Sequence, residues 1–212
     1  MELKIEVFSD IVCPWCYVGK RRLDAALKSF DSRIPVSVTW KAFQLNPKLP
    51  TEGVAWAEYM HQKFGAQRVQ EMNANLTELG KEDGINFRFD KIQRSPNTFQ
   101  AHRLNWLARQ EGQQDEVVEA VFRAYFSEGK DIGEIQTLMK IGAACGIPLQ
   151  RLQRFFGSSE GVSEVQAEVQ EAVARDISMV PHFVMNKEYW ISGADTIETF
   201  SNACRVAAQA SA

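Results

Sequence analysis

Two cysteines near the N-terminus, Cys13 and Cys16, have the spacing of a redox-active dithiol. They flank Pro14 and Trp15, and they follow an apolar stretch that ends at Ser9. Thiols two residues apart at the start of a helix can close into a disulfide and reopen, since about one turn of helix separates the two sulfurs. The pair therefore predicts thiol–disulfide exchange, with Cys13 and Cys16 as the catalytic residues.

The predicted helix start gives the two cysteines different roles. Pro14 suits the first helical position, because its ring fixes φ and its missing N–H would be unpaired there anyway. Cys13 is then the N-cap, where its sulfur would accept hydrogen bonds from the amides around Trp15 and Cys16 and would feel the positive end of the helix dipole. A thiolate is favoured there, so we expect Cys13 to attack a substrate and Cys16 to resolve the mixed disulfide.

Asp10 and His102 are candidate accessory residues. Asp10 precedes the dithiol and could orient or deprotonate a thiol, or it could be a turn residue, a frequent place for Asp. His102 could act near the dithiol or form a structural hydrogen bond within the helical part of the chain. The basic run at residues 20–22 could add positive potential at the dithiol or could be a solvated helix face.

The elements that must position the dithiol begin with a βαβ unit. Apolar and charged residues alternate over residues 3–9, which predicts a strand, and apolar side chains then recur at helical spacing as far as Phe30. Residues 34–43 alternate again and predict a second strand, parallel to the first after a right-handed crossover.

The middle of the chain is dominated by helical patterns. Residues 85–89 alternate, and we interpret them as either a short strand or an extended connection. Glycine and proline are expected to break the helices at five positions: Gly65, Gly80, Gly112, Gly129 and Pro148.

Strand patterns return after Arg175 and predict a hairpin with its turn at Asn186 and Lys187. Asp195 or Thr196 could cap a last helix. The predicted fold class is α/β, with a βαβ unit and a ββα unit interrupted by a large all-helical insertion. The corresponding domains are residues 1–50 with 176–212, and the insertion at residues 51–175.

Composition restricts the class of protein. Of 212 residues, 45% are hydrophobic and 24% charged, and 24 Lys and Arg face 27 Asp and Glu. A net charge of −3 gives no overall positive electrostatic potential that would attract a polyanion, so we expect no nucleic-acid partner. No apolar run approaches the roughly 18 to 20 residues of a membrane span, so we expect no membrane partner. Charges interrupt the first apolar stretch, unlike in a secretory signal, which predicts a cytoplasmic protein.

The other two cysteines, Cys145 and Cys204, lie in apolar helical patterns and are expected to be small buried side chains. A disulfide between them stays open at this level. We expect no metal site, because the dithiol has no second pair of ligands of the kind that structural zinc requires.

Several segments along the chain share residues with one known family: Asp10-Ile11-Val12-Cys13-Pro14-Trp15-Cys16-Tyr17-Val18-Gly19, Leu45-Asn46-Pro47, Asn97-Thr98, Ala101-His102-Arg103, Met179-Val180-Pro181 and Ile191-Ser192-Gly193-Ala194. Together they resemble the DsbA-like proteins, and more narrowly their FrnE-type branch. The resemblance implies a thioredoxin-like fold with a helical insertion and exchange through Cys13 and Cys16. It also implies a cis bond at Val180-Pro181 facing the dithiol, with Val180 as the backbone edge that pairs with a substrate. Pro14, Trp15, Val180 and Pro181 would then shape the active site.

Related proteins leave an alternative open. The 2-hydroxychromene-2-carboxylate isomerases and the kappa-class glutathione transferases are similar to this chain in overall plan and use glutathione, but they typically carry serine where this chain has Cys13. A glutathione-dependent isomerase or transferase is therefore the alternative, and an inert binding module is a third. For the preferred interpretation we expect thiol or disulfide substrates, either proteins or small molecules. We expect no dissociable cofactor, with glutathione as a candidate reductant or ligand.

Overall fold

The computed structural model describes residues 2–210. Its strands are β1 (Leu3–Ser9), β2 (Val36–Ala42), β3 (Val54–Ala55), β4 (Arg94–Ser95), β5 (His182–Met185) and β6 (Tyr189–Ser192). Its helices are α1 (Pro14–Lys28), α2 (Trp56–Phe64), α3 (Ala66–Glu82), α4 (Phe99–Gln110), α5 (Gln114–Phe126), α6 (Ile135–Ala144), α7 (Leu149–Phe156), α8 (Val162–Ala174) and α9 (Ile197–Ala210), with a short 3-10 helix, η1, at Phe89–Lys91. This order confirms the predicted α/β fold class.

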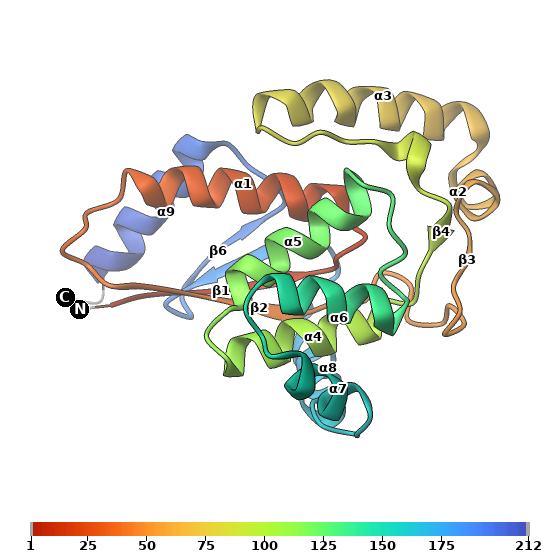
Figure 1. Cartoon of the computed structure of the whole chain (residues 1–212). Coiled ribbons are helices and arrows are strands. Elements are labelled where there is room, and N and C mark those ends of the chain that lie inside the picture. The colour runs from red at the N-terminus through yellow and green to blue at the C-terminus, as the bar shows by residue number, and fades with distance from the viewer. Residues whose placement is uncertain (1, 211–212) are drawn as a thin grey trace.

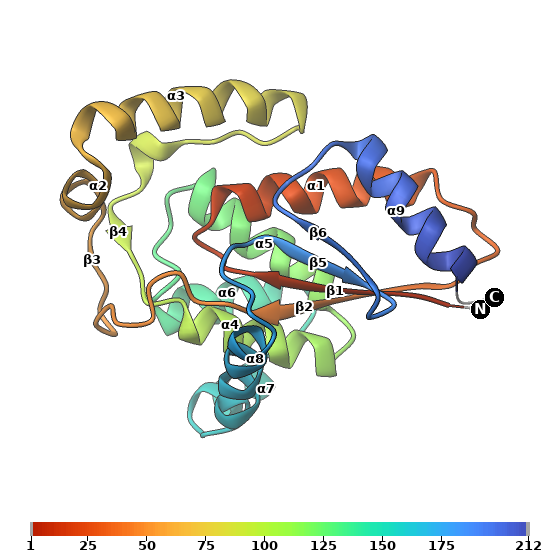
Figure 2. The ribbon, with the colours of Figure 1, turned by 180° about the vertical axis from the view of Figure 1, so that it is seen from behind.

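Four strands form the central sheet in the order β2-β1-β5-β6 (Figure 2). β1 runs parallel to β2, because α1 carries the chain back between them, and antiparallel to β5. β5 begins with His182 opposite Phe8, next to the end of β1. The segment that precedes β5 therefore enters the sheet at the same end at which the chain leaves β1 toward Cys13.

The two faces of the sheet are covered differently. Alternate residues of β1, such as Ile5 and Val7, are buried in the main core, and α9 packs against β1, β5 and β6. On the other face Phe8 packs with Ala172 of α8 and with Val184 of β5. α4, α5 and α8 all contact β2, so the helices of the middle segment complete the core of the sheet.

α2 and α3 lie at the end of the molecule opposite the two chain termini (Figure 1). Between them and the sheet runs the connection over residues 83–98, which is extended at residues 85–88 and contains η1 and β4. The alternating stretch is thus a connection rather than a strand over residues 85–88, and its last residue, Phe89, begins η1. The middle segment is mainly helical, and it also holds the two-residue antiparallel pair of β3 and β4.

The prediction of a helix break at Gly80 is wrong, because Gly80 lies inside α3, which continues to Glu82. A Cβ at this position would come within 2.5 Å of the Phe87 ring. The glycine therefore serves the close approach of the connection to α3, and the chain turns instead at Gly84, where φ is +69°.

The turns and the last cap follow the predicted residues. Asn186 and Lys187 have φ of 48° and 65° in the turn between β5 and β6. The Thr196 hydroxyl accepts the N–H of Thr199 at 3.1 Å and so caps α9, while Asp195 accepts the N–H of Thr196 at 2.7 Å. The domain boundaries at residues 50 and 176 stay predictions.

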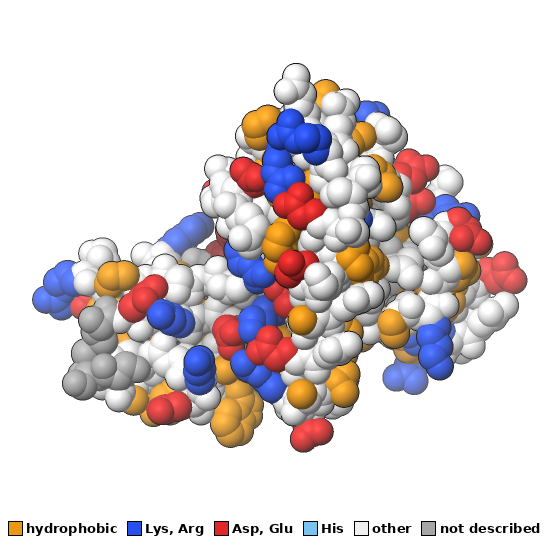
Figure 3. Space-filling view, turned by 90° about the horizontal axis from the view of Figure 1, so that it is seen from below, with side chains coloured by type: hydrophobic (Ala, Val, Ile, Leu, Met, Phe, Trp, Pro, Cys, Tyr) orange, Lys and Arg blue, Asp and Glu red, His pale blue; other side chains and the backbone are white. Residues whose placement is uncertain are grey.

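The surface on the side of α7 and α8 carries interspersed positive and negative side chains (Figure 3). Several of them form ion pairs, such as Arg151 with Glu111 and Glu160, and Arg109 with Glu168. Within residues 2–210, no helix has both the length and the apolar composition needed to cross a membrane.

Candidate functional site

Cys13 is the N-cap of α1 and Pro14 is its first residue, as the sequence predicts. The Cys13 N–H donates to the Asp10 carbonyl at 3.0 Å, a turn that leads from β1 into α1. The prediction that the Cys13 sulfur accepts hydrogen bonds from first-turn amides is wrong for the reduced dithiol of this structure. The thiol instead donates to the Val180 carbonyl oxygen, with sulfur and oxygen 3.6 Å apart. A protonated thiol is a weak acceptor, and a carbonyl offers its S–H a better partner.

Cys16 is fully buried behind Cys13. Burial raises the pKa of the Cys16 thiol well above its usual value, and the adjacent Cys13 sulfur raises it further. The Ser9 hydroxyl and the Asp10 backbone favour the thiolate but do not offset the burial. The two sulfurs therefore have distinct environments: Cys16 is a neutral thiol held next to Cys13.

Sequence reasoning missed Ser9. Its hydroxyl is buried beside Cys16 and has no hydrogen-bond partner of ordinary geometry within residues 2–210. The sequence contained a signal for it: Ser9 continues the inward-facing series of Ile5 and Val7 at the end of β1. A polar side chain at a buried position of this kind is costly unless it has a partner or a function.

Val180 and Pro181 lie across from the dithiol, and the peptide bond between them is cis. A Cβ on Gly19 of α1 would come within 3.0 Å of both the Pro181 ring and the Phe183 ring, so the glycine allows this close approach. The Pro181 carbonyl accepts the Gly193 N–H at 2.8 Å, which fixes the loop to the end of β6. Val180 itself is half-buried.

Asp10 and His102 form a buried pair. The His102 Nε2 lies 3.3 Å from Asp10 Oδ1, and the Leu45 N–H donates to Asp10 Oδ2 at 2.7 Å. Asp10 is fully buried and also forms the turn before Cys13 through its backbone carbonyl. Both residues proposed as accessories thus lie together below the turn, where they link α4 and the segment after β2 to the end of β1.

The basic run at residues 20–22 does not form a positive patch at the dithiol. Lys20 is 1% exposed and pairs with Asp24 and Asp115, each with N–O distances of 2.8 to 3.0 Å. Arg21 pairs with Glu119, and Arg22 pairs with Asp83, the C-cap residue of α3. Both predictions for this run, a solvated helix face and a source of positive potential at the dithiol, are therefore wrong. Its charges are neutralised by carboxylates between α1 and the elements that pack against it.

A cavity of about 210 Å³ opens beside Cys13, Pro14 and Trp15. Its opposite walls come from α2, α3, η1 and α5, elements that the sequence places in the insertion. The lining residues outside the dithiol motif are mostly apolar: Val12, Leu45, Asn46, Leu49, Trp56, Tyr59, Met60, Lys63, Phe64, Met72, Asn73, Leu76, Phe89, Ser95, Pro96, Tyr125 and Phe126. Trp15 is 43% exposed at its rim.

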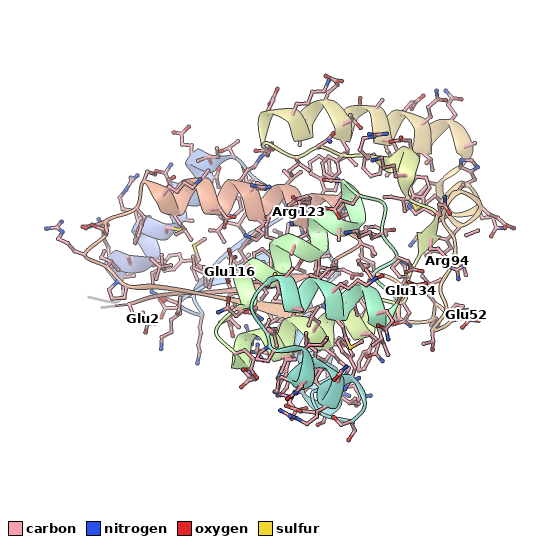
Figure 4. The ribbon with its side chains drawn as sticks, viewed as in Figure 1. Glu2, Glu52, Arg94, Glu116, Arg123 and Glu134 are labelled. Carbon is pink, nitrogen blue, oxygen red and sulfur yellow. The ribbon has the colours of Figure 1, made fainter. Side chains whose placement is uncertain are left out.

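The strand pair β3–β4 holds the outer end of this cavity. Arg94 donates to the backbone carbonyls of Glu52 and Gly53, and Figure 4 shows Arg94 and Glu52 at the end of the molecule where the two strands pair. The Trp56 N–H donates to the Gln93 carbonyl at 2.9 Å, so the start of α2 is fixed to the same connection.

The remaining cysteines are free thiols away from the dithiol, and no disulfide joins them. Cys204 is buried as predicted, which raises its pKa to about 11. Cys145 is only half-buried at the end of α6, where its thiol donates to the Glu116 carbonyl at 3.6 Å, so the prediction of full burial is wrong for this residue. The described part of the chain holds no group of three or more His, Cys, Asp or Glu suited to a metal ion.

Comparison with known proteins agrees with this arrangement. A crystal structure of the probable DsbA oxidoreductase SCO1869 from Streptomyces coelicolor has a TM-score of 0.90 and 28% identity, covering 98% of this chain and 91% of that one. The protein YwbO of Bacillus subtilis (strain 168) is 27% identical over 205 residues, 96% of either chain. The cytosolic disulfide reductase DsbM of Pseudomonas aeruginosa, solved with GSH, shares the fold, with a TM-score of 0.60 at 14% identity over 98% of this chain and 97% of that one. The model of the DSBA-like thioredoxin domain matches residues 4–205, and the chain therefore belongs to the DsbA-like thioredoxin-domain family.

Proposed function

We propose that this protein is a thiol–disulfide oxidoreductase that uses the dithiol of Cys13 and Cys16 as its redox group. The observation that carries the proposal is the position of the Cys13 sulfur, 3.6 Å from the Val180 carbonyl oxygen, with Cys16 buried behind it. A sulfur at a helix start, a backbone edge beside it and a second thiol within reach are the parts that disulfide exchange needs.

The reaction proceeds in two exchanges. The Cys13 thiolate attacks one sulfur of a substrate disulfide, the substrate S–S bond breaks, and one substrate thiolate leaves. Cys16 then loses its proton and attacks the Cys13 sulfur, which releases the second substrate thiolate and closes the Cys13–Cys16 disulfide. The substrate gains two electrons and the dithiol loses two, and the reverse sequence oxidises a substrate dithiol.

The backbone at Val180 is the proposed docking edge for an extended substrate segment. Its N–H donates no hydrogen bond within residues 2–210, and Met179 beside it is 59% exposed. An unpaired backbone edge next to a reactive sulfur can pair with a substrate strand by main-chain hydrogen bonds. Such pairing depends little on the amino-acid sequence of the substrate, because it uses main-chain groups.

In this proposal the dithiol needs no dissociable cofactor, and its substrates are protein or small-molecule thiols and disulfides. A cytoplasmic location and the use of glutathione as reductant are part of the proposal, and DsbM, a cytosolic relative in fold that was solved with GSH, is consistent with both. The direction of exchange follows from the potential of the dithiol, which in related sites spans about −270 to −120 mV.

The mostly apolar cavity beside Cys13 supports a second candidate function, a glutathione-dependent isomerase or transferase acting on a small apolar substrate. This candidate predicts that S-methyl glutathione binds equally well to wild type and to Cys13→Ser, since it needs no thiolate at position 13. Calorimetry that detects no binding to either protein would remove it.

The proposed function is tested by reduction of insulin disulfides with dithiothreitol as the electron source. We expect turnover in wild type and its loss in Cys13→Ser. Cys145→Ser is the matched control, because it removes a half-buried thiol outside the site and should keep full activity. Equal turnover in Cys13→Ser and wild type would contradict the proposal.

A further inference from the structure

The cavity beside Cys13 is sized for one small organic group. At about 210 Å³ it exceeds the roughly 150 Å³ of a protein cavity that accepts benzene, so an aromatic ring with one or two substituents fits. Trp56, Tyr59 and Met60 of α2 and Leu76 of α3 supply apolar walls opposite the dithiol. An apolar group that binds here gains free energy in proportion to the apolar surface area that it removes from water.

Lys63 carries the one formal charge among the described residues that line this cavity. Its ammonium lies 2.6 Å from Asn46 Oδ1 and 3.2 Å from the Tyr59 hydroxyl, and over the Tyr59 and Phe64 rings at 5.4 and 5.6 Å. All of these partners are neutral, and no carboxylate within residues 2–210 lies within ion-pair distance of it. The cavity therefore has one positive charge without a carboxylate partner, on a lining that is otherwise uncharged and mostly apolar.

Lysines of α3 and α1 differ in this respect. Lys81 of α3 lies 2.7 Å from Glu78, and Lys20 of α1 is neutralised by Asp24 and Asp115. Other lysines, such as Lys48 and Lys91, also form no ion pair within residues 2–210, so Lys63 differs from them in lining the cavity, where an anionic group of a ligand could pair with it.

We propose that this cavity selects small organic disulfides that pair an aromatic or compact apolar group with an anionic group, with the apolar part between α2 and α3 and the anion at Lys63. This inference rests on the proposed disulfide exchange. The Cys13 thiolate attacks one sulfur of the bound disulfide and expels the outer half as a thiolate. The retained half stays in the cavity as a mixed disulfide until Cys16 expels it, and dithiothreitol or another dithiol reduces the resulting Cys13–Cys16 disulfide.

The test is stopped-flow kinetics of the reduced protein in a Cys145→Ser background with three probes. These are dithiobis(nitrobenzoate), which is aromatic and anionic, dithiodipyridine, which is aromatic and neutral, and bis(hydroxyethyl) disulfide, which is small and neutral. We expect Lys63→Met to slow the reaction with dithiobis(nitrobenzoate) about two- to fivefold, as for an ion pair with an exposed lysine, and to leave both neutral probes unchanged. Molar salt should remove most of the difference.

Two further variants separate charge and shape. Lys81→Met changes the net charge equally but removes a paired lysine, and it should leave all three rates unchanged. Met60→Trp fills the cavity, so it should slow both aromatic probes and spare bis(hydroxyethyl) disulfide. Identical rates in wild type, Lys63→Met and Met60→Trp would overturn the cavity inference while leaving exchange at Cys13 intact. Full reactivity of Cys13→Ser with all three probes would instead overturn the proposed function.

Discussion

The Cys13 sulfur and the Val180 carbonyl oxygen lie 3.6 Å apart although 167 residues separate them in sequence. The pairing of β1 with β5 produces this contact, because the chain leaves β1 toward Cys13 at the point where it enters β5 from Pro181. The nucleophile and the backbone edge of the proposed site are therefore held by adjacent strands of one sheet. Their relative position therefore follows from the pairing of β1 with β5.

Cys16→Ala should trap the mixed disulfide. With the resolving thiol removed, a substrate half attached to Cys13 has no internal route of release, so the adduct should accumulate to about one per chain. Intact mass spectrometry after mixing with a small disulfide measures it. An adduct that fails to outlast the one in wild type would show that Cys16 does not resolve it.

The resolving step should accelerate with pH. Burial raises the pKa of Cys16, so its reactive thiolate is a minor species at neutral pH, and its fraction grows about tenfold per pH unit below that pKa. The contribution of Cys13 to this pKa disappears in the mixed disulfide, but burial remains the first cause. Single-turnover release of the second substrate thiolate should therefore rise steadily between pH 6 and 8, and a flat profile would contradict this environment for Cys16.

Gly19→Ala should displace Pro181. The added Cβ would lie 3.0 Å from the Pro181 and Phe183 rings, and one of them must shift. We expect exchange to slow by about tenfold, because small displacements of reacting groups are costly. Ala25→Gly in the same helix is the control, since it weakens α1 by about 1 kcal/mol without touching Pro181 and should keep the rate. Comparable rates in both variants would show that this contact does not position the site.

Asp10→Ala should destabilise the protein by about 2 to 4 kcal/mol, because it removes the acceptor of the buried Leu45 N–H and the partner of His102. Asp10→Asn should recover part of the loss, since its side-chain oxygen can still accept the Leu45 N–H. Urea unfolding measures both. Asp31→Ala, which removes an exposed pair with Arg33, should leave the midpoint unchanged. A midpoint for Asp10→Ala equal to that of the control would show that the buried pair adds no stability.

Local features of the fold and the site could be predicted from the sequence. The alternation in β1 and the Pro14 helix start depend on neighbouring residues, and both are found where expected. The pairing of Asp10 with His102 could not be predicted, although both residues were singled out, because 92 residues separate them and only the packing of α4 against β2, beside β1, brings them together.

The cavity was hidden from sequence reasoning for another reason. Trp56, Met60 and Phe64 recur every four residues, the helical spacing of a core-facing surface, and the same spacing is found in a helix that lines a cavity. Only the arrangement of α2 and α3 apart from the sheet distinguishes the two. Gly80 was misinterpreted for a similar reason, since its role depends on Phe87 in the returning connection.

A glutathione redox titration, with the state of each cysteine mapped by mass spectrometry, shows whether Cys13 and Cys16 act as one redox pair. We expect a single two-electron transition in which Cys13 and Cys16 form one disulfide, while Cys145 and Cys204 stay outside it. Its midpoint should fall within the range of about −270 to −120 mV that related dithiols span. Glutathione attached to Cys13 throughout the titration, with no Cys13–Cys16 disulfide at any ratio, would show that the two cysteines are not a redox pair.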